Sequence, residues 1–256
     1  MKSRWIAVVL LLVSLPLRAQ TPFFTVPAPK GVLRVALVPA ENVTASDIDV
    51  VKNAIESYYG VRVTTLPTLT LAGRVNVKGR SRSVRTRAGR KRVVTDSTVL
   101  AGFPFGFFRE HAGEGFDVTV GLMGYGLSTG DGKWTIRGLT GRFKGDTCSV
   151  VTTYLVRQQS ATAAEYRFRL TKVALHEFGH ALGLPHCGDT VANSTQYAEY
   201  SDKVTTIAKG DPRCFMMQST ADGAQLYATT NQMCGQCQAR IKGNARPHTF
   251  LRQSGP

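Results

Sequence analysis

The sequence predicts an α+β protein, in which a twisted mixed β-sheet is combined with helices and a small irregular C-terminal part. Three observations carry this prediction. Strand and helix patterns follow each other in the order β-α-β near the N-terminus, several short strand candidates come next, and a long helical pattern starts at about Ala161. With 256 residues, 43% of them apolar and 19% charged, the chain suits one large core and is not a disordered polyelectrolyte.

The N-terminus has the pattern of a secretory signal peptide. Lys2 and Arg4 supply positive charge, an apolar run of 13 residues follows over 5–17, and Ala19 offers a small residue for cleavage. The run is shorter than the roughly 20 residues that span a bilayer, and no other segment is apolar enough to do so. We therefore expect a signal peptide over 1–19 and an exported protein, secreted or periplasmic.

Beyond the signal peptide, the sequence divides into three parts. Residues 20–30 contain three prolines and read as an extended leader. Residues 31–242 hold the predicted core and the candidate site, and 243–256 form a basic tail. Nothing in composition indicates the oligomeric state.

Residues 31–66 predict a β-α-β unit. Segments 31–39 and 61–66 are rich in Val, Leu and Thr, as strands are. Between them, apolar residues recur at helical spacing, Thr44 to Ser46 offer N-caps, and Gly60 ends the pattern. This order favours parallel strands joined by a right-handed crossover.

The middle of the chain predicts more strands, with less certain boundaries. Segments 116–122, 134–139 and 149–156 are strand candidates separated by glycine-rich turns. Segment 95–111 is ambiguous, because glycine and proline interrupt any long helix while four phenylalanines require burial. A last helix is expected over 234–242.

Residues 74–92 carry nine positive charges and no acid, within a chain of net charge +15. One interpretation is a solvated loop or an edge hairpin. The alternative is a docking patch for a polyanion, such as a cell-wall polymer or anionic lipid. The run contains no aromatic residue on which bases would stack, so we do not predict specific nucleic-acid binding.

The strongest chemical signal is a histidine motif on the long predicted helix. His176 and His180 are four residues apart, which places both imidazoles on one helix face and within reach of one zinc ion. Glu177 lies about 100° further round the helix. A carboxylate there can take a proton from a water that zinc acidifies and pass it to the leaving amine.

A third ligand requires the chain to turn back after the helix. Gly183 can adopt the left-handed conformation that ends a helix, and Pro185 prevents continuation. His186 is then the third histidine, and three neutral nitrogen ligands leave a fourth position open, as in catalytic zinc sites. The complete pattern HExxHxxGxxH is the one typical of metzincins.

Cysteines extend this pattern. Cys187 follows the third histidine, Cys214 begins a CxM sequence that ends at Met216, and after 17 residues comes a CxxC of Cys234 and Cys237. The stretch from His176 to Cys237 resembles the archaemetzincin family, whose zinc motif is joined to the same cysteine pattern.

The resemblance implies a zincin/metzincin-like fold and a zinc-dependent peptidase. It implies a catalytic zinc on His176, His180 and His186, with Glu177 as the catalytic base. It selects Met216, rather than its neighbour Met217, as the methionine of the turn beneath the metal. It also implies a second, structural zinc, with the ligands Cys187, Cys214, Cys234 and Cys237.

One departure from the family is plain. This chain has 26 residues between its first two cysteines of the pattern, where the family has about four. We expect the insertion 188–213 to border the substrate cleft. In an exported protein two disulfides are an alternative to the thiolate zinc site. Cys148 is left over and is expected to be a buried, unreactive thiol, while His111 and His248 are expected to bind no metal.

The sequence therefore predicts a secreted zinc metallopeptidase that acts on peptide or protein substrates. Whether it cleaves inside a chain or at its N-terminus stays open. One alternative is a zinc-containing binding protein that docks on polyanionic surfaces through residues 74–92. Another is zinc-dependent hydrolysis of an amide that is not a peptide.

Overall fold

The structure is a computed structural model, and it describes residues 33–72, 77–85, 91–100, 103–128, 135–143, 146–188, 210–217, 227 and 230–243. The predicted signal peptide over 1–19, the predicted leader over 20–30 and the tail beyond residue 243 lie outside the described residues. So does the part 189–209 of the insertion 188–213. In the described part, no helix is both long enough and apolar enough to cross a membrane.

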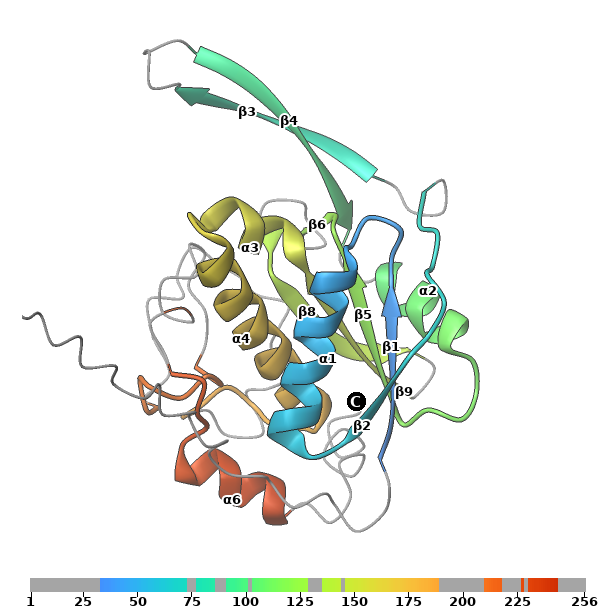
Figure 1. The fold of residues 1–256 in the computed structure, drawn as a ribbon, viewed down its shortest axis with the longest axis vertical. Coiled ribbons are helices and arrows are strands. Elements are labelled where there is room, and N and C mark those ends of the chain that lie inside the picture. The colour runs from blue at the N-terminus through green and yellow to red at the C-terminus, as the bar shows by residue number, and fades with distance from the viewer. Residues whose placement is uncertain are drawn as a thin grey trace, which may run out of the picture.

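A five-stranded mixed sheet forms the centre of the molecule (Figure 1), in the order β2-β1-β5-β9-β8. Its strands are β1 (Arg34–Pro39), β2 (Arg62–Thr65), β5 (Val118–Met123), β8 (Gly138–Phe143) and β9 (Asp146–Thr152). The first four in spatial order run parallel, and β8 pairs antiparallel with β9 at the edge. The predicted mixed sheet is confirmed.

Helices cover both faces of this sheet. Helices α1 (Ala45–Tyr59), α3 (Thr153–Gln159) and α4 (Ala163–Ala181) lie on one face and α2 (Phe103–Ala112) on the other (Figure 1). The alternation of β1 shows why: Val35 and Leu37 pack in the core with α1 and α4, while Ala36 and Val38 pack with α2. Because both faces of the sheet are buried, the sheet is a rigid support on which α4 packs.

The predicted β-α-β unit is present. Thr44 caps α1 through a capping box, since its side chain accepts from the Asp47 backbone at 3.2 Å and Asp47 accepts from the Thr44 backbone at 3.0 Å. Gly60 ends the helix in the left-handed conformation at φ 65°.

A smaller sheet has the strand order β3-β4-β6-β7. It contains β3 (Val77–Arg85), β4 (Lys91–Leu100), β6 (Gly126–Ser128) and β7 (Thr135–Ile136). Strands β3 and β4 form an antiparallel hairpin that projects from the body of the molecule (Figure 1). The basic run therefore lies largely on a hairpin, which was one of the two interpretations of 74–92.

Two expectations about boundaries were wrong. The strand predicted over 149–156 ends at Thr152, whose side chain caps α3 by accepting from the Tyr154 backbone at 3.2 Å. Val and Tyr in this stretch suit a strand, but the cap decides for a helix. The strand predicted over 134–139 is interrupted at Arg137 and resumes as β8.

For two other segments the structure agrees with the sequence analysis or settles what it left open. The ambiguous segment 95–111 divides into the end of β4 and helix α2, with Phe105 and Phe108 buried against the sheet. Pro104 is tolerated because it lies in the first turn of α2, where no backbone donor is lost. The last helix, α6 (Gly235–Gly243), agrees with the expected one to within a residue.

Candidate active site and metal centres

The end of α4 and the turn after it bring the three histidines together. Gly183 has φ 87° and its N–H bonds to the His180 carbonyl at 2.9 Å, so the helix stops where the sequence predicted. The chain then turns back and carries His186 to the helix face that holds the other two. One ring nitrogen from each histidine lies within 4.8 Å of the others.

Hydrogen bonds indicate which ring nitrogen of His176 and of His180 can bind a metal ion. The Nδ1 atoms of His176 and His180 each lie 2.7 Å from a backbone carbonyl, that of Phe215 and that of Leu184. A ring that donates from Nδ1 keeps its lone pair on Nε2, as metal-binding histidines do. The two Nε2 atoms are 3.0 Å apart. Tetrahedral zinc with Zn–N bonds of about 2.05 Å requires about 3.3 Å, so this donor set fits zinc.

Burial keeps the imidazoles neutral. It lowers the pKa of His176 to about 4 and that of His186 to about 3, against the usual 6.5. The pKa of His180 falls well below its usual value through burial and the two neighbouring histidines. Neutral imidazole is the form that binds a metal ion.

Glu177 is buried between α4 and strand β8. Burial raises the pKa of its carboxyl to about 8, while a hydrogen bond from Thr140 acts in the opposite direction. Oγ1 of Thr140 lies 2.9 Å from Oε2 of Glu177. Gly138 leaves room for this side chain, because a Cβ at 138 would lie 2.4 Å from Cγ of Glu177. The carboxyl group therefore sits one residue beyond a histidine of the cluster, shielded from bulk water.

The structure places Met216, and not Met217, under the histidine helix. A Cβ at Gly179 would come within 2.4 Å of the Met216 sulfur and within 3.1 Å of the Tyr59 hydroxyl oxygen. Tyr59 donates to the Leu175 carbonyl at 2.7 Å. Gly179 therefore lets the methionine and the tyrosine pack directly against the helix backbone.

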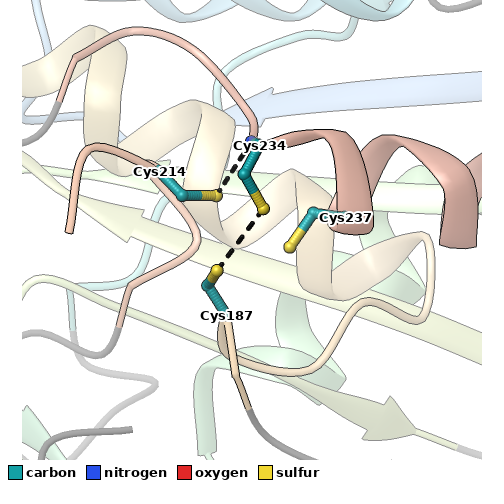
Figure 2. A group of neighbouring side chains, drawn as sticks. All are labelled: Cys187, Cys214, Cys234 and Cys237. Carbon is teal, nitrogen blue, oxygen red and sulfur yellow. Dashed lines mark hydrogen bonds between the residues drawn. The ribbon is translucent and has the colours of Figure 1, made fainter. Parts of the chain in front are cut away.

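Four cysteines from three segments form a second cluster. Their sulfur atoms lie within 4.8 Å of one another and point toward a common centre (Figure 2). Cys187 follows α4, Cys214 lies in the segment 210–217, and Cys234 and Cys237 flank the start of α6. The sulfurs of Cys187 and Cys234 are 3.5 Å apart, near the roughly 3.8 Å of tetrahedral zinc with Zn–S bonds of about 2.3 Å. This donor set also fits zinc.

The thiols cannot all ionise without a cation. Hydrogen bonds from Cys214 and Cys237 lower the pKa of Cys187. The same contacts raise the pKa of Cys214 and of Cys237. One thiolate thus opposes the next, and only a positive ion at the centre would let several form together.

The two clusters are joined by short stretches of backbone. His186 and Cys187 are neighbours in sequence, and the N–H of Cys187 donates to the Met216 carbonyl at 2.8 Å. Phe215, between Cys214 and Met216, provides the carbonyl that holds His176. The segment 210–217 thus contacts both clusters.

The long insertion does not keep the first two cysteines apart. At its ends, a Cβ at Gly210 would lie 2.3 Å from the Cys187 carbonyl oxygen, so this glycine allows a close approach of the two strands of the loop. Closing a long loop costs little more than closing a short one. The length of the insertion is therefore compatible with a four-cysteine cluster.

His111 and Cys148 stand apart from both clusters. The Nε2 atom of His111 lies 2.9 Å from the Pro67 carbonyl, and His248 lies outside the described residues. Cys148 is fully buried, which raises its pKa, and it belongs to neither group of metal-binding side chains found in the described part.

Sequence reasoning missed the surroundings of Glu177. Thr140, Ser149 and Gly138 come from β8 and β9, and no local pattern indicated that these strands face the histidine helix. Gly179 did carry a signal, because glycine inside a helix is costly and indicates a close contact.

Comparisons with known proteins bear on this fold and on the histidine segment. The family profile of the matrixins (Peptidase_M10) matches residues 110–214. No curated protein matches the chain at a significant level.

Three solved structures share the fold. The archaemetzincin of Methanopyrus kandleri is 20% identical, with a TM-score of 0.57 over 84% of this chain and 97% of its own. The archaemetzincin of Archaeoglobus fulgidus, in complex with malonate, is 18% identical, with a TM-score of 0.54 over 81% and 99%. A zinc-dependent peptidase from Methanocorpusculum labreanum is 14% identical, with a TM-score of 0.51 over 81% and 99%.

The predicted resemblance is thereby confirmed at the level of the fold. The matrixin match covers the histidine motif and ends at Cys214. The chain therefore has the metzincin-like α+β fold of the archaemetzincin structures, and its histidine motif lies within the stretch that matches the matrixin profile.

Proposed function

We propose that this chain is a zinc metallopeptidase that hydrolyses peptide bonds, with Glu177 as general base. The observation that carries the proposal is the buried carboxyl group of Glu177 beside three neutral imidazoles, from each of which one ring nitrogen lies within 4.8 Å of the others. His176, His180 and His186 would hold the zinc ion. The similarity of the fold to those of zinc peptidases supports the same function.

The chemistry divides between the metal and the carboxyl group. Zinc supplies a Lewis acid that polarises the scissile carbonyl and acidifies the attacking water. Glu177 takes the proton from that water and delivers it to the leaving amine. Burial raises the pKa of this carboxyl group in the zinc-free protein, which makes it a stronger base than an exposed glutamate.

Strand β8 offers a place for the peptide. It forms one edge of the five-stranded sheet, and two of its residues, Gly138 and Thr140, contact Glu177. An extended peptide that added to this edge as a further strand would lie next to the base. This supports a peptide substrate over another amide.

The four cysteines are proposed to bind a second, structural zinc. Cys187, Cys214, Cys234 and Cys237 would tie α6 and the segment 210–217 to the end of α4. The distances among the sulfurs support zinc over two disulfides, since a disulfide requires a separation of about 2.05 Å and the sulfurs of Cys187 and Cys234 are 3.5 Å apart.

Export and the insertion complete the proposal. The signal-peptide pattern over 1–19 supports a secreted or periplasmic location.

The insertion begins directly after His186 and Cys187 in the sequence, which supports its placement at the border of the substrate cleft. Deletion of residues 190–210 should change which peptides are cleaved, and unchanged activity on every substrate would contradict this part.

In addition to peptide hydrolysis, binding to a polyanion is proposed for residues 74–92. The projection of the β3–β4 hairpin from the body supports it, because the basic run is presented away from the sheet (Figure 1). Such binding should weaken steeply as salt rises, whereas turnover of a neutral peptide should change little.

The proposed activity is tested with a peptide library and zinc-reconstituted protein. We expect cleavage that a chelator abolishes and added zinc restores. The Glu177→Ala variant should keep its zinc content and lose hydrolysis. Full activity of this variant would contradict the role of Glu177.

A further inference from the structure

Thr140 occupies a fixed place beside the carboxyl group of Glu177. In the register of β8 and β9, Thr140 lies opposite Ser149, and Gly138 lies two residues earlier on the same face. Leu139, between them, packs in the other core cluster with α2. The alternation of the edge strand therefore turns Gly138 and Thr140 toward α4.

Hydrogen bonds from these strands reach Glu177 at two points. The Thr140 hydroxyl is 2.9 Å from Oε2 of Glu177 and 2.8 Å from the Ser149 hydroxyl. Ser149 is fully buried and lies 3.0 Å from the backbone carbonyl of Glu177. The Thr140 hydroxyl also lies 3.0 Å from that carbonyl. When Ser149 donates to the carbonyl, the proton of Thr140 is left for Oε2.

The other side of the carboxyl group is restricted by shape. A Cβ at Gly138 would lie 2.5 Å from Oε1 of Glu177. Oε2 thus accepts a hydrogen bond from Thr140. Oε1 lies against Gly138, where a larger residue would clash with it. Few orientations of the side chain satisfy both conditions.

We propose that Thr140 is a positioning residue for the hydrolytic reaction, which orients the Glu177 carboxyl group through its hydroxyl. The inference rests on the proposed peptidase function. Thr140 does not bind zinc or substrate in this role. It holds one carboxyl oxygen so that the other is directed to the reacting water.

The test compares four variants with the wild-type enzyme, all reconstituted with zinc. Thr140→Val replaces the hydroxyl by a methyl group and keeps the branched shape that suits a strand. We expect kcat to fall roughly 10- to 100-fold, the range typical of lost outer hydrogen bonds at metal sites, while KM and zinc content stay unchanged. Thr140→Ser keeps the hydroxyl and should restore most of kcat.

Thr119→Val is the matched control. Thr119 is a buried threonine of β5 in the same sheet, and its hydroxyl has no hydrogen-bond partner among the described residues. The same change of atoms there should leave kcat, KM and zinc content as they are. Thr140→Ala removes the hydroxyl without adding a methyl group in its place, and it replaces Thr140→Val if valine does not fit beside Glu177.

The outcomes separate this inference from the function on which it rests. Wild-type kcat in Thr140→Val, or a Ser variant as slow as the Val variant, would overturn the role of Thr140 alone. Loss of folding or of zinc in both the Val and Ala variants would assign Thr140 to structure and also overturn it. An inactive wild-type enzyme with full zinc would overturn the peptidase function itself.

Discussion

The three-histidine cluster and the four-cysteine cluster share a loop but are built on opposite principles. The histidine cluster is set by a helix and one turn, and backbone carbonyls already orient two of its rings. Its donors are neutral, so they tolerate one another without a metal ion. The cysteine cluster joins three separate segments, and its donors oppose each other's ionisation. The histidine site is thus preorganised without a metal ion, whereas the neighbouring cysteine site needs its metal ion to stay assembled.

This contrast predicts an asymmetric dependence between the clusters. The cysteine cluster fastens the segment 210–217, which supplies the Phe215 carbonyl to His176. In return, the histidine helix holds this segment through the hydrogen bond of His176 to the Phe215 carbonyl and through the packing of Met216, and neither contact requires a metal ion. Damage to the cysteine cluster should therefore reach the histidines, whereas damage to the histidines should stay local.

The largest expected effect comes from Cys214→Ser. Cys214 accepts from the Cys234 backbone at 3.3 Å and directly precedes Phe215. Its loss should release the structural zinc, lower the thermal midpoint by more than about 10 °C, and weaken zinc binding by the histidines. Metal analysis and calorimetry check this. Cys148→Ser, which alters a buried thiol outside the cluster, is the control, and equal loss of metal there would contradict the asymmetry.

His180→Ala tests whether damage to the histidine cluster stays local. This change removes one of three nitrogen donors, so the catalytic zinc should be lost and hydrolysis with it. The four-cysteine zinc should remain. A measured content of one zinc ion per chain with four protected thiols agrees with the account, and loss of both ions would show that the dependence is mutual.

The stability of the metal-free protein should fall in acid. The folded-state pKa of His176 is lowered to about 4 from 6.5, so the unfolded chain binds a proton first as the pH falls. The contribution of His176 to stability is then full above about pH 6.5 and is lost between pH 6.5 and 4. Denaturant unfolding at several pH values measures this. His111→Gln should keep the slope, and a flat profile in the wild type would contradict burial of neutral histidines.

Gly179→Ala should have the smallest effect of the four. The added methyl group would meet the Met216 sulfur at 2.4 Å, and overpacking of this kind costs about 1–3 kcal/mol. Thermal unfolding should show the loss, with both metals retained. An unchanged midpoint would mean that Met216 does not press on the helix.

The same contrast explains what the sequence could and could not predict. The histidine motif lies within 11 residues, so helical periodicity and the glycine stop placed all three histidines together. The cysteine cluster spans 51 residues and was predicted only through the family pattern. Strands β1, β2, β5 and β9 were predicted from composition and patterning. Helix α3 was missed because a single threonine cap outweighed a strand-like composition.

The surroundings of Glu177 lay beyond sequence reasoning for a physical reason. Thr140 and Ser149 meet Glu177 through the register of two strands and the packing of α4 on the sheet. Neither spacing nor propensity encodes which face of an edge strand lies under a given helix. Short motifs predict ligands, while the groups that orient them depend on the tertiary fold.

Metal content of the purified chain, together with a count of reactive thiols, tests the central claim most directly. Two zinc ions per chain, with Cys187, Cys214, Cys234 and Cys237 protected, is the predicted result. One zinc ion with two disulfides would contradict the four-cysteine metal site and leave the histidine site standing. No zinc after careful reconstitution would contradict both sites and the peptidase function built on them.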